Sequence, residues 1–162
     1  MNQFRLMNWT LAFCLLAVAG LHAEPAAQAA PEADAARGAK LVKLCDTCHT
    51  VRGPDQKPVI GELAGGKVMV GTTAGSNLTS SATGLGKYDE KMFRQALREG
   101  MVGTRKLAVM NPALFRNMTD DDLHAVWTYL RQLPKVEHIV DNSQPPTACK
   151  KCRQTHGGGD KN

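Results

Sequence analysis

The chain lacks a hydrophobic run long enough to cross a bilayer near its start. The apolar stretch at 9–21 spans about 13 residues, whereas a membrane-spanning helix needs about 20. Arg5 precedes the stretch and the small residue Ala23 follows it, which is typical of a secretory signal peptide. We therefore predict a signal peptide over 1–23 and a periplasmic mature protein. An uncleaved membrane anchor is the alternative.

Features of nucleic-acid-binding proteins are also missing. The formal net charge of +5 is only mildly basic. The sequence has neither an arginine-rich helix nor alternating aromatic and basic residues, so nucleic acid is not an expected partner. The positive charge instead suits docking to an acidic surface of another protein.

No stretch alternates apolar and polar side chains as a half-buried strand would, so we predict an all-α fold. A first helix is expected from about Asp34, which can cap it, and a second helix from Asp89 to Gly100. The last helix begins at Thr119 with a Thr-x-x-acid capping box, continues with apolar residues at helical spacing, and ends at Pro134.

Two segments are poor in large apolar side chains. Residues 24–33 have none, which predicts a flexible leader. Residues 52–87 are rich in glycine and too long for an ordinary loop of a compact domain, unless they wrap a large apolar group. The chain is accordingly divided into a signal peptide at 1–23, a leader at 24–33, a helical domain at 34–136 and a C-terminal tail at 137–162.

The cysteines that follow the signal peptide form two pairs. The first pair lies in the sequence Cys45-Asp-Thr-Cys48-His49, which is the attachment motif of haem c. Two thiols three residues apart reach the two vinyl groups of one macrocycle, and His49 then lies under the iron. A disulfide or a redox-active CxxC is the alternative, but the βαβ setting of a thioredoxin-like protein is missing. We predict one covalent haem c held by Cys45, Cys48 and His49.

The sixth ligand of the iron is expected to be Met110. This residue stands in an irregular segment between two helices, with Pro112 shortly after it, so its thioether can reach the haem without breaking a helix. Packing roles are the simpler explanation for four other methionines. These are Met69, Met92, Met101 and Met118. Among the histidines, His124 is expected at the surface, and His138 and His156 lie beyond the helical core.

The second cysteine pair, Cys149 and Cys152, is followed by Arg153 where a haem motif would have histidine. A closed zinc site needs four Cys or His ligands, and Cys149, Cys152 and His156 supply only three. Lys150 and its basic neighbours would also repel a divalent cation. We therefore predict a local Cys149–Cys152 disulfide, with a metal site or a labile redox pair as alternatives.

Five stretches together are more specific than the haem motif alone. They are Cys-Asp-Thr-Cys-His-Thr at 45–50, Ala-Gly-Gly at 64–66, the run from Asn77 to Gly86, the run from Phe93 to Gly100, and the run from Met118 to Leu130. With these stretches, residues 37–136 resemble the class I monohaem cytochrome c domain. They are most similar to the haem domains in the cytochrome c subunits of membrane-bound alcohol, aldehyde and gluconate dehydrogenases.

The resemblance implies a class I cytochrome c fold, with a few helices and long glycine-rich loops around one haem. By position, it implies that Cys45 and Cys48 bind the haem and that His49 and Met110 ligate its iron. The family usually has proline directly after the ligand methionine, whereas Asn111 intervenes here.

The resemblance also implies that Gly38 packs against Trp127 and Tyr129, where the first and last helices cross.

With both axial positions filled, the expected function is electron transfer and not catalysis. The expected partners are redox proteins, a dehydrogenase or an oxidase of a respiratory chain. No small-molecule substrate is expected, and the membrane is reached only through a partner. Two other functions stay open: a haem enzyme or sensor with a free sixth position, and a thiol-redox module built on Cys149 and Cys152.

Overall fold

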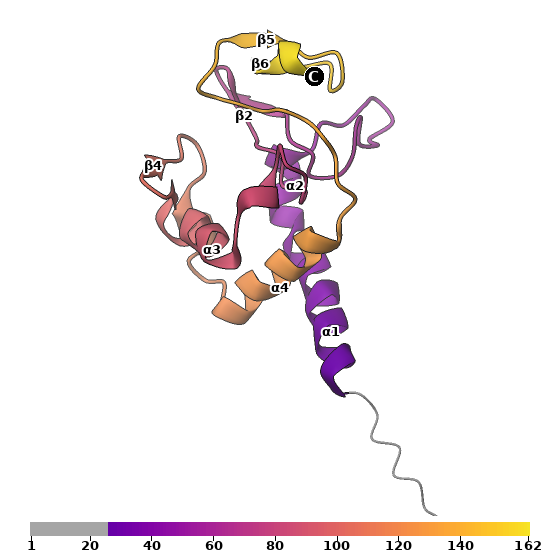
Figure 1. Ribbon diagram of the computed structural model, residues 1–162, viewed down its shortest axis with the longest axis vertical. Helices are drawn as coiled ribbons and strands as arrows, with labels where there is room; N and C mark the ends of the chain where they lie inside the picture. Colours follow the sequence, from indigo (N-terminus) through magenta and orange to yellow (C-terminus); the bar gives the residue numbers. More distant parts are fainter. Residues whose placement is uncertain (1–25) are drawn as a thin grey trace, which may run out of the picture.

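The computed structural model describes residues 26–162, and Figure 1 shows their arrangement. The predicted signal peptide at 1–23 lies outside the described residues. Among the described residues, no helix has both the length and the apolar character needed to cross a membrane.

Helices dominate the described part of the chain, and they confirm the predicted all-α class. The α-helices are α1 (Ala26–Leu41), α2 (Lys43–His49), α3 (Glu90–Glu99) and α4 (Asp120–Gln132). Short 3-10 helices are η1 (Leu85–Lys87), η2 (Pro112–Phe115) and η3 (Gly159–Lys161).

Three short antiparallel strand pairs, which the sequence did not predict, complete the described elements. They are β1 (Val68–Val70) with β2 (Thr73–Ala74), β3 (Met101–Val102) with β4 (Arg105–Lys106), and β5 (Pro146–Ala148) with β6 (Thr155–Gly157). Each pair is a local hairpin of two or three residues per strand, too short to show an alternating apolar pattern.

Helix α1 starts at Ala26, so the predicted start at Asp34 is wrong and Asp34 does not cap the helix. Residues 26–33, which we assigned to the leader, form its first turns. The reason is local, because this part of the chain is rich in alanine, the strongest helix former. Helix propensity therefore extends α1 where no large apolar side chain is present.

The predicted ends of α3 and α4 are confirmed. The Asp89 side chain accepts a hydrogen bond from the backbone N–H of Met92, and Gly100 ends α3 in the left-handed conformation, with φ of 67°. At α4, Thr119 and Asp122 form the complete capping box. Polar side chains thus satisfy N–H groups that the first turn of a helix leaves unpaired.

Helices α1 and α4 cross, as Figure 1 shows, and Gly38 of α1 lies against Ala125 and Tyr129 of α4. A Cβ at this position would overlap the Ala125 backbone and lie 2.8 Å from Cβ of Tyr129. The predicted crossing and the contact with Tyr129 are confirmed. Trp127, which was also expected there, stacks on Phe93 with 5.5 Å between ring centroids. Only glycine allows the two backbones to approach this closely.

The main hydrophobic core is formed largely by α3 and α4, and residues of the long loop and of η2 pack against them. Its buried members are Val42, Leu63, Leu85, Phe93, Leu97, Phe115, Leu123, Val126 and Leu130. Met118 packs against this core from directly before α4, as expected for the residue that precedes a capped helix.

Residues 52–87 are held mainly by polar contacts and not by a core of their own. Asn77, Thr79 and Ser81 are buried. The Asn77 side chain donates to the Val136 carbonyl at 2.7 Å and accepts from the Thr79 N–H at 2.9 Å. One amide thus connects the long loop to the segment that leaves α4 and leads to the C-terminal strands β5 and β6, drawn above β2 in Figure 1.

Candidate haem site

One short helix carries all three residues of the predicted haem attachment. Cys45, Cys48 and His49 lie in α2, and each is half-buried. The i, i+3 spacing places the two cysteines on one face of the helix. Both thiols are free, and burial raises the pKa of Cys45 to about 12, with smaller contributions from Cys48 and Asp46.

The ring of His49 is oriented by the long loop. Its Nδ1 lies 2.7 Å from the Ser76 carbonyl oxygen, and its own carbonyl accepts from the N–H of Gly65 at 2.7 Å. A carbonyl only accepts, so Nδ1 carries the proton and Nε2 keeps its lone pair for a metal. Burial lowers the pKa of His49, which favours the same neutral imidazole.

Asp46, inside the motif, closes the end of α2. It accepts from the Thr50 hydroxyl at 2.7 Å and from Arg52 Nη2 at 2.7 Å. Burial acts to raise the pKa of Asp46, but the hydrogen bonds from Thr50 and Arg52 outweigh it and hold this pKa below its usual value. The Thr50 hydroxyl also accepts from the Leu63 N–H at 2.9 Å, which connects the motif to the core.

Met110 lies in the irregular segment between β4 and η2, as predicted, and packs half-buried against the main core. Cys45 borders the same core. The Asn111 side chain accepts from the Ala113 N–H at 3.0 Å, with Pro112 in the first position of η2. Asn111 therefore has a local structural role, because it caps the 3-10 helix that follows Met110.

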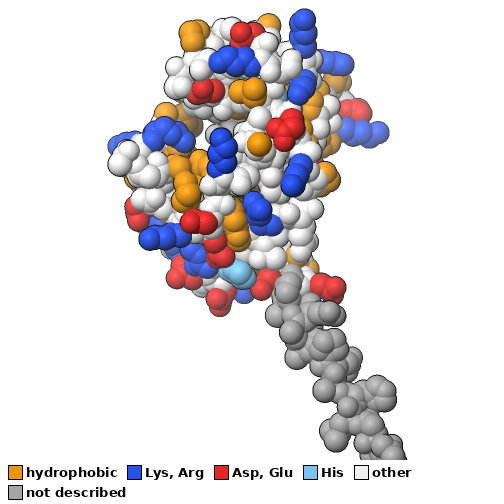
Figure 2. Space-filling model, in the orientation of Figure 1, with side chains coloured by type: hydrophobic (Ala, Val, Ile, Leu, Met, Phe, Trp, Pro, Cys, Tyr) orange, Lys and Arg blue, Asp and Glu red, His pale blue; other side chains and the backbone are white. Residues whose placement is uncertain are grey.

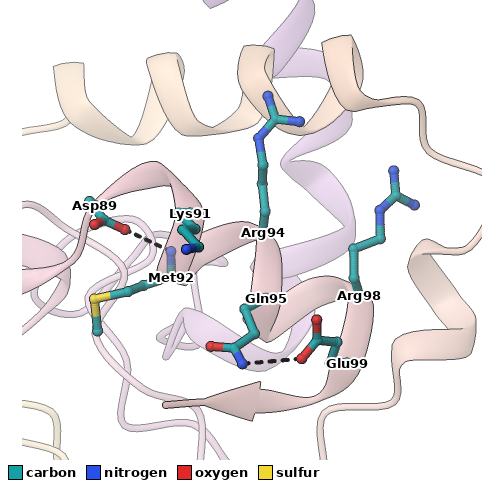
Figure 3. Close-up of a pocket in the computed structure, with 7 residues that line it drawn as sticks. All are labelled: Asp89, Lys91, Met92, Arg94, Gln95, Arg98 and Glu99. Carbon is teal, nitrogen blue, oxygen red and sulfur yellow. Dashed lines mark hydrogen bonds between the residues drawn. The ribbon is translucent and has the colours of Figure 1, made fainter.

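The other methionines lie on regular elements or directly beside one. Met69 is in β1, Met92 in α3 and Met101 in β3, while Met118 precedes α4. Met92 lines a shallow surface pocket made by α3 alone, which contains none of the predicted haem residues (Figure 3). That pocket is bordered by charged side chains, among them Arg94 and Glu99.

The donor set fits a covalent haem. Two unpaired thiols on one face of α2 precede a histidine whose Nε2 is left for iron, and a thioether borders the same core. Leu44 and Val109, which directly precede Cys45 and Met110, are 61% and 41% exposed. Figure 2 shows further hydrophobic side chains on one face of the molecule, bordered by lysine and arginine.

Among the remaining histidines, His124 is exposed, as predicted, and lies 3.0 Å from Glu90 Oε1. His138 and His156 are buried and meet Cys149 and Cys152 beyond the helical domain. Both of these cysteines are free, so the predicted Cys149–Cys152 disulfide is wrong. His138 was not expected beside this pair, because it lies 11 residues before Cys149 and outside the Cys-x-x-Cys motif.

The burial of the second cysteine pair does not favour a thiol-redox module. Cys149 and Cys152 are both buried. Thiol exchange requires a sulfur that another thiol can reach, and both sulfurs lie inside the protein.

These features define a small helical protein built around a covalent haem. The family model described as Cytochrome c matches residues 35–134, and the chain belongs to this family. Its cofactor is covalently bound haem c, and it is a haem-based electron-transfer protein of a family that generally transfers electrons and does not catalyse reactions. None of the curated proteins compared with the chain matches it.

Proposed function

We propose that this protein is a periplasmic electron carrier with one haem c, bound through Cys45 and Cys48, with His49 and Met110 as axial ligands. The observation that carries the proposal is the His49–Ser76 hydrogen bond, at 2.7 Å. It directs the lone pair of Nε2 away from the loop, on the helix that also presents both thiols.

The haem supplies a one-electron couple, and the chain sets its surroundings. Ser76 holds the imidazole in one tautomer and orientation. As an iron ligand, the Met110 thioether would be a weak donor, which would favour ferrous iron and raise the reduction potential above that of a site with two nitrogen ligands. His49 is held by the Ser76 carbonyl and Met110 packs against the core, so both side chains would hold the iron with little movement when its oxidation state changes.

We further propose that the partner is a dehydrogenase or an oxidase of a respiratory chain, which docks beside the haem. Two observations support this proposal. Leu44 and Val109 expose apolar surface next to Cys45, a proposed attachment residue, and Met110, a proposed iron ligand. The formal charge of +5 favours an acidic docking surface on the partner.

The axial ligand is tested by the substitution Met110→Ala. The variant is expected to lose the weak near-infrared band of methionine bound to ferric iron and to have a lower potential, because the thioether is removed. Its ferrous form should bind carbon monoxide, whereas the wild-type protein should not. Spectra and a redox titration measure these changes.

Met92→Ala is the matched control, because Met92 lies on the outer pocket of α3. It should keep the band and the potential. If the band survives in Met110→Ala and is lost in Met101→Ala or Met69→Ala, the assignment is wrong. Carbon monoxide binding by the wild-type protein would instead indicate an open sixth position and a sensor or an enzyme.

Location and partner need separate tests. The mass of the protein from a periplasmic fraction should correspond to cleavage near Ala23, and an intact N-terminus would contradict the proposed signal peptide.

Membrane-bound alcohol, aldehyde or gluconate dehydrogenase preparations supplied with substrate should reduce the purified protein, as followed in the haem absorption bands. Failure of all three would exclude these partners.

A further inference from the structure

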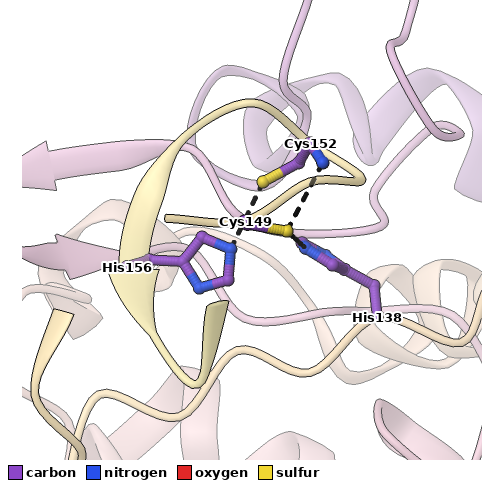
Figure 4. A group of neighbouring side chains, drawn as sticks. All are labelled: His138, Cys149, Cys152 and His156. Atoms are coloured by element: carbon purple, nitrogen blue, oxygen red, sulfur yellow. Dashed lines mark hydrogen bonds between the residues drawn. The ribbon is translucent and has the colours of Figure 1, made fainter. Parts of the chain in front are cut away.

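The second cysteine pair belongs to a cluster of four side chains that converge in the C-terminal tail (Figure 4). Cys149 and Cys152 lie in the turn between β5 and β6, His156 lies in β6, and His138 comes from the segment between α4 and β5. The four side chains are buried, and their ligand atoms all lie within 4.8 Å of one another.

The distances within the cluster fit a tetrahedral metal site. His138 Nε2 lies 3.5 Å from Cys149 Sγ, and His156 Nε2 lies 3.3 Å from Cys152 Sγ. Zinc binds thiolate at about 2.3 Å and imidazole at about 2.0–2.1 Å, which places neighbouring S and N ligands about 3.6 Å apart in a tetrahedron. The side chains therefore need little movement to surround one ion.

Both imidazoles are held in the tautomer that a metal requires. His138 Nδ1 lies 2.7 Å from the Ala64 carbonyl oxygen, and His156 Nδ1 lies 3.0 Å from the Gly157 carbonyl oxygen. Each Nδ1 must donate to its carbonyl, so each Nε2 presents a lone pair toward the thiols. Such backbone hydrogen bonds commonly orient the histidine ligands of metals.

The turn that carries the cysteines is shaped for two sulfur ligands. The Cys149 N–H donates to the Gln154 carbonyl at 2.8 Å, and the Cys152 N–H donates to Cys149 Sγ at 3.4 Å. Arg153 adopts a positive φ of 61°, which turns the chain back toward β6. An N–H directed at a sulfur stabilises a thiolate there.

The basic residues of the turn do not oppose a cation at this place. Lys150 and Arg153 are exposed, and Lys151 Nζ donates to the Glu137 carbonyl at 2.7 Å. Their charges are directed to solvent or to a backbone oxygen, and no lysine or arginine side chain belongs to the buried cluster of four ligands. The repulsion that the sequence suggested is thereby reduced.

We propose that His138, Cys149, Cys152 and His156 bind a structural zinc ion. Two thiolates and two imidazoles in a closed arrangement are a donor set that suits Zn²⁺, and a site with four protein ligands leaves no position for a substrate. The second cysteine pair therefore serves as half of a metal clamp and not as a disulfide.

The zinc would fix the tail against the loop that orients the haem ligand. Gly66 lies against the cluster, since a Cβ there would lie 2.7 Å from Cε1 of His138 and 3.0 Å from Sγ of Cys152. Its neighbour Gly65 donates to the carbonyl of His49. Farther along the loop, the Asn142 side chain bonds both backbone groups of Ala74, at 2.8 and 2.9 Å. The tail thus contacts the loop shortly before β1, at Gly66, and at the end of β2, at Ala74.

The first test is the metal content of the mature holoprotein, purified without chelator or affinity metal. Elemental analysis by inductively coupled plasma mass spectrometry should find about one zinc per haem. X-ray absorption spectroscopy at the zinc edge should show equal numbers of sulfur and nitrogen ligands. Iron beyond the haem content, with no zinc, would overturn the assignment, and so would the absence of any additional metal.

Thiol alkylation distinguishes a metal site from a disulfide in the same sample. The cysteines of a zinc site should resist alkylation until a strong chelator is added, with no reductant required. If a reductant exposes them and a chelator does not, the pair is a disulfide and the proposal fails. If both alkylate without either reagent, the site is empty and the proposal also fails.

Variants test the ligand set. His138→Ala should lose zinc to near zero per haem, because a missing ligand opens the site. His124→Ala is the matched control, since His124 is an exposed histidine on α4, and it should keep the zinc. The haem bands report whether the domain is folded in each variant. Full zinc retention in His138→Ala, or loss in His124→Ala, would contradict the proposal.

Discussion

At the scale of single residues, the Asn77 side chain holds the long loop through hydrogen bonds to several partners. Its amide donates to the Val136 carbonyl at 2.7 Å and to the His138 carbonyl at 3.3 Å, while its oxygen accepts from Thr79. Asn77 is buried, so water could not take over the hydrogen bonds that its amide makes to the two carbonyls and to Thr79. A single residue therefore joins the loop that orients His49 to the irregular segment that follows α4.

Asn77→Ala should destabilise the holoprotein by about 1–3 kcal/mol, because it leaves buried carbonyl and hydroxyl groups without their partner. Denaturant unfolding followed by tryptophan fluorescence measures the change. Asn117→Ala, at an exposed position between η2 and α4, is the control and should stay within about 0.5 kcal/mol of the wild type. Equal stability of the two variants would show that the Asn77 contacts contribute nothing.

At the scale of secondary-structure elements, side chains that cap the helices determine where the helices begin. The α4 capping box is one case, with the Asp122 carboxylate accepting from the Thr119 N–H at 2.8 Å. Asp122 also forms an ion pair with Arg37 of α1 at 2.7 Å. The Thr119 backbone and side-chain hydrogen bonds lower the pKa of Asp122, and Arg37 adds to this effect. The same carboxylate therefore starts α4 and connects it to α1.

Asp122→Asn should lower stability by about 0.3–1.5 kcal/mol at neutral pH. Because the folded state lowers the pKa of Asp122, its carboxylate stabilises the fold above the unfolded pKa, and this contribution is lost as the pH falls through the folded pKa. The difference between variant and wild type should thus shrink below about pH 4.

Asp121→Asn is the control for this measurement, since it removes a charge from the same first turn. Unfolding midpoints between neutral and acid pH give the comparison for all three proteins. A difference between Asp122→Asn and the wild type that does not depend on pH would exclude the capping carboxylate as its source.

The crossing of α1 and α4 depends on one missing side chain. Gly38→Ala should cost about 1–3 kcal/mol, because its Cβ meets the Ala125 backbone, which cannot rotate away. Ala36→Leu, on an exposed position of α1, adds more volume and should be nearly neutral. Thermal unfolding of the holoproteins tests both, and an unchanged midpoint for Gly38→Ala would mean that the helices are not this close.

At the scale of the whole molecule, charge governs how the protein meets small and large redox partners. The formal charge is +5 before the haem propionates are counted and before any loss of Arg5 with a signal peptide. A net positive molecule attracts anions over a Debye length, which is about 30 Å at 0.01 M salt and about 3 Å at 1 M.

Ferricyanide is an anion, so its rate of oxidising the ferrous protein should fall as the salt concentration rises over this range. We expect a decrease of roughly a few-fold, as is typical when electrostatic attraction steers association. A cationic oxidant such as a cobalt phenanthroline complex is the control and should show the opposite trend. Stopped-flow rates decide the matter, and a rate with ferricyanide that rises with salt would mean that the surface around the haem is negative.

The sequence alone determined what is encoded at short range. The haem motif of Cys45, Cys48 and His49 lies within five residues, and the caps at Asp89 and Thr119 act within a single turn. Such signals depend on covalent neighbours, so they can be recognised without a fold. The helix propensity of the alanines at the start of α1 is equally local. It did not lead to a predicted helix, because this segment has no large apolar side chains at helical spacing.

Only the tertiary structure decided which distant groups meet. The Ser76 carbonyl reaches His49 from 27 residues away, and Ala64 reaches His138 across 74 residues. His138 could not be assigned to the cysteine pair from spacing, because its approach depends on where α4 ends and on how Asn77 holds the chain that follows. Backbone carbonyls and long-range partners leave no trace in residue identity, and their positions are set by the packing of the whole molecule.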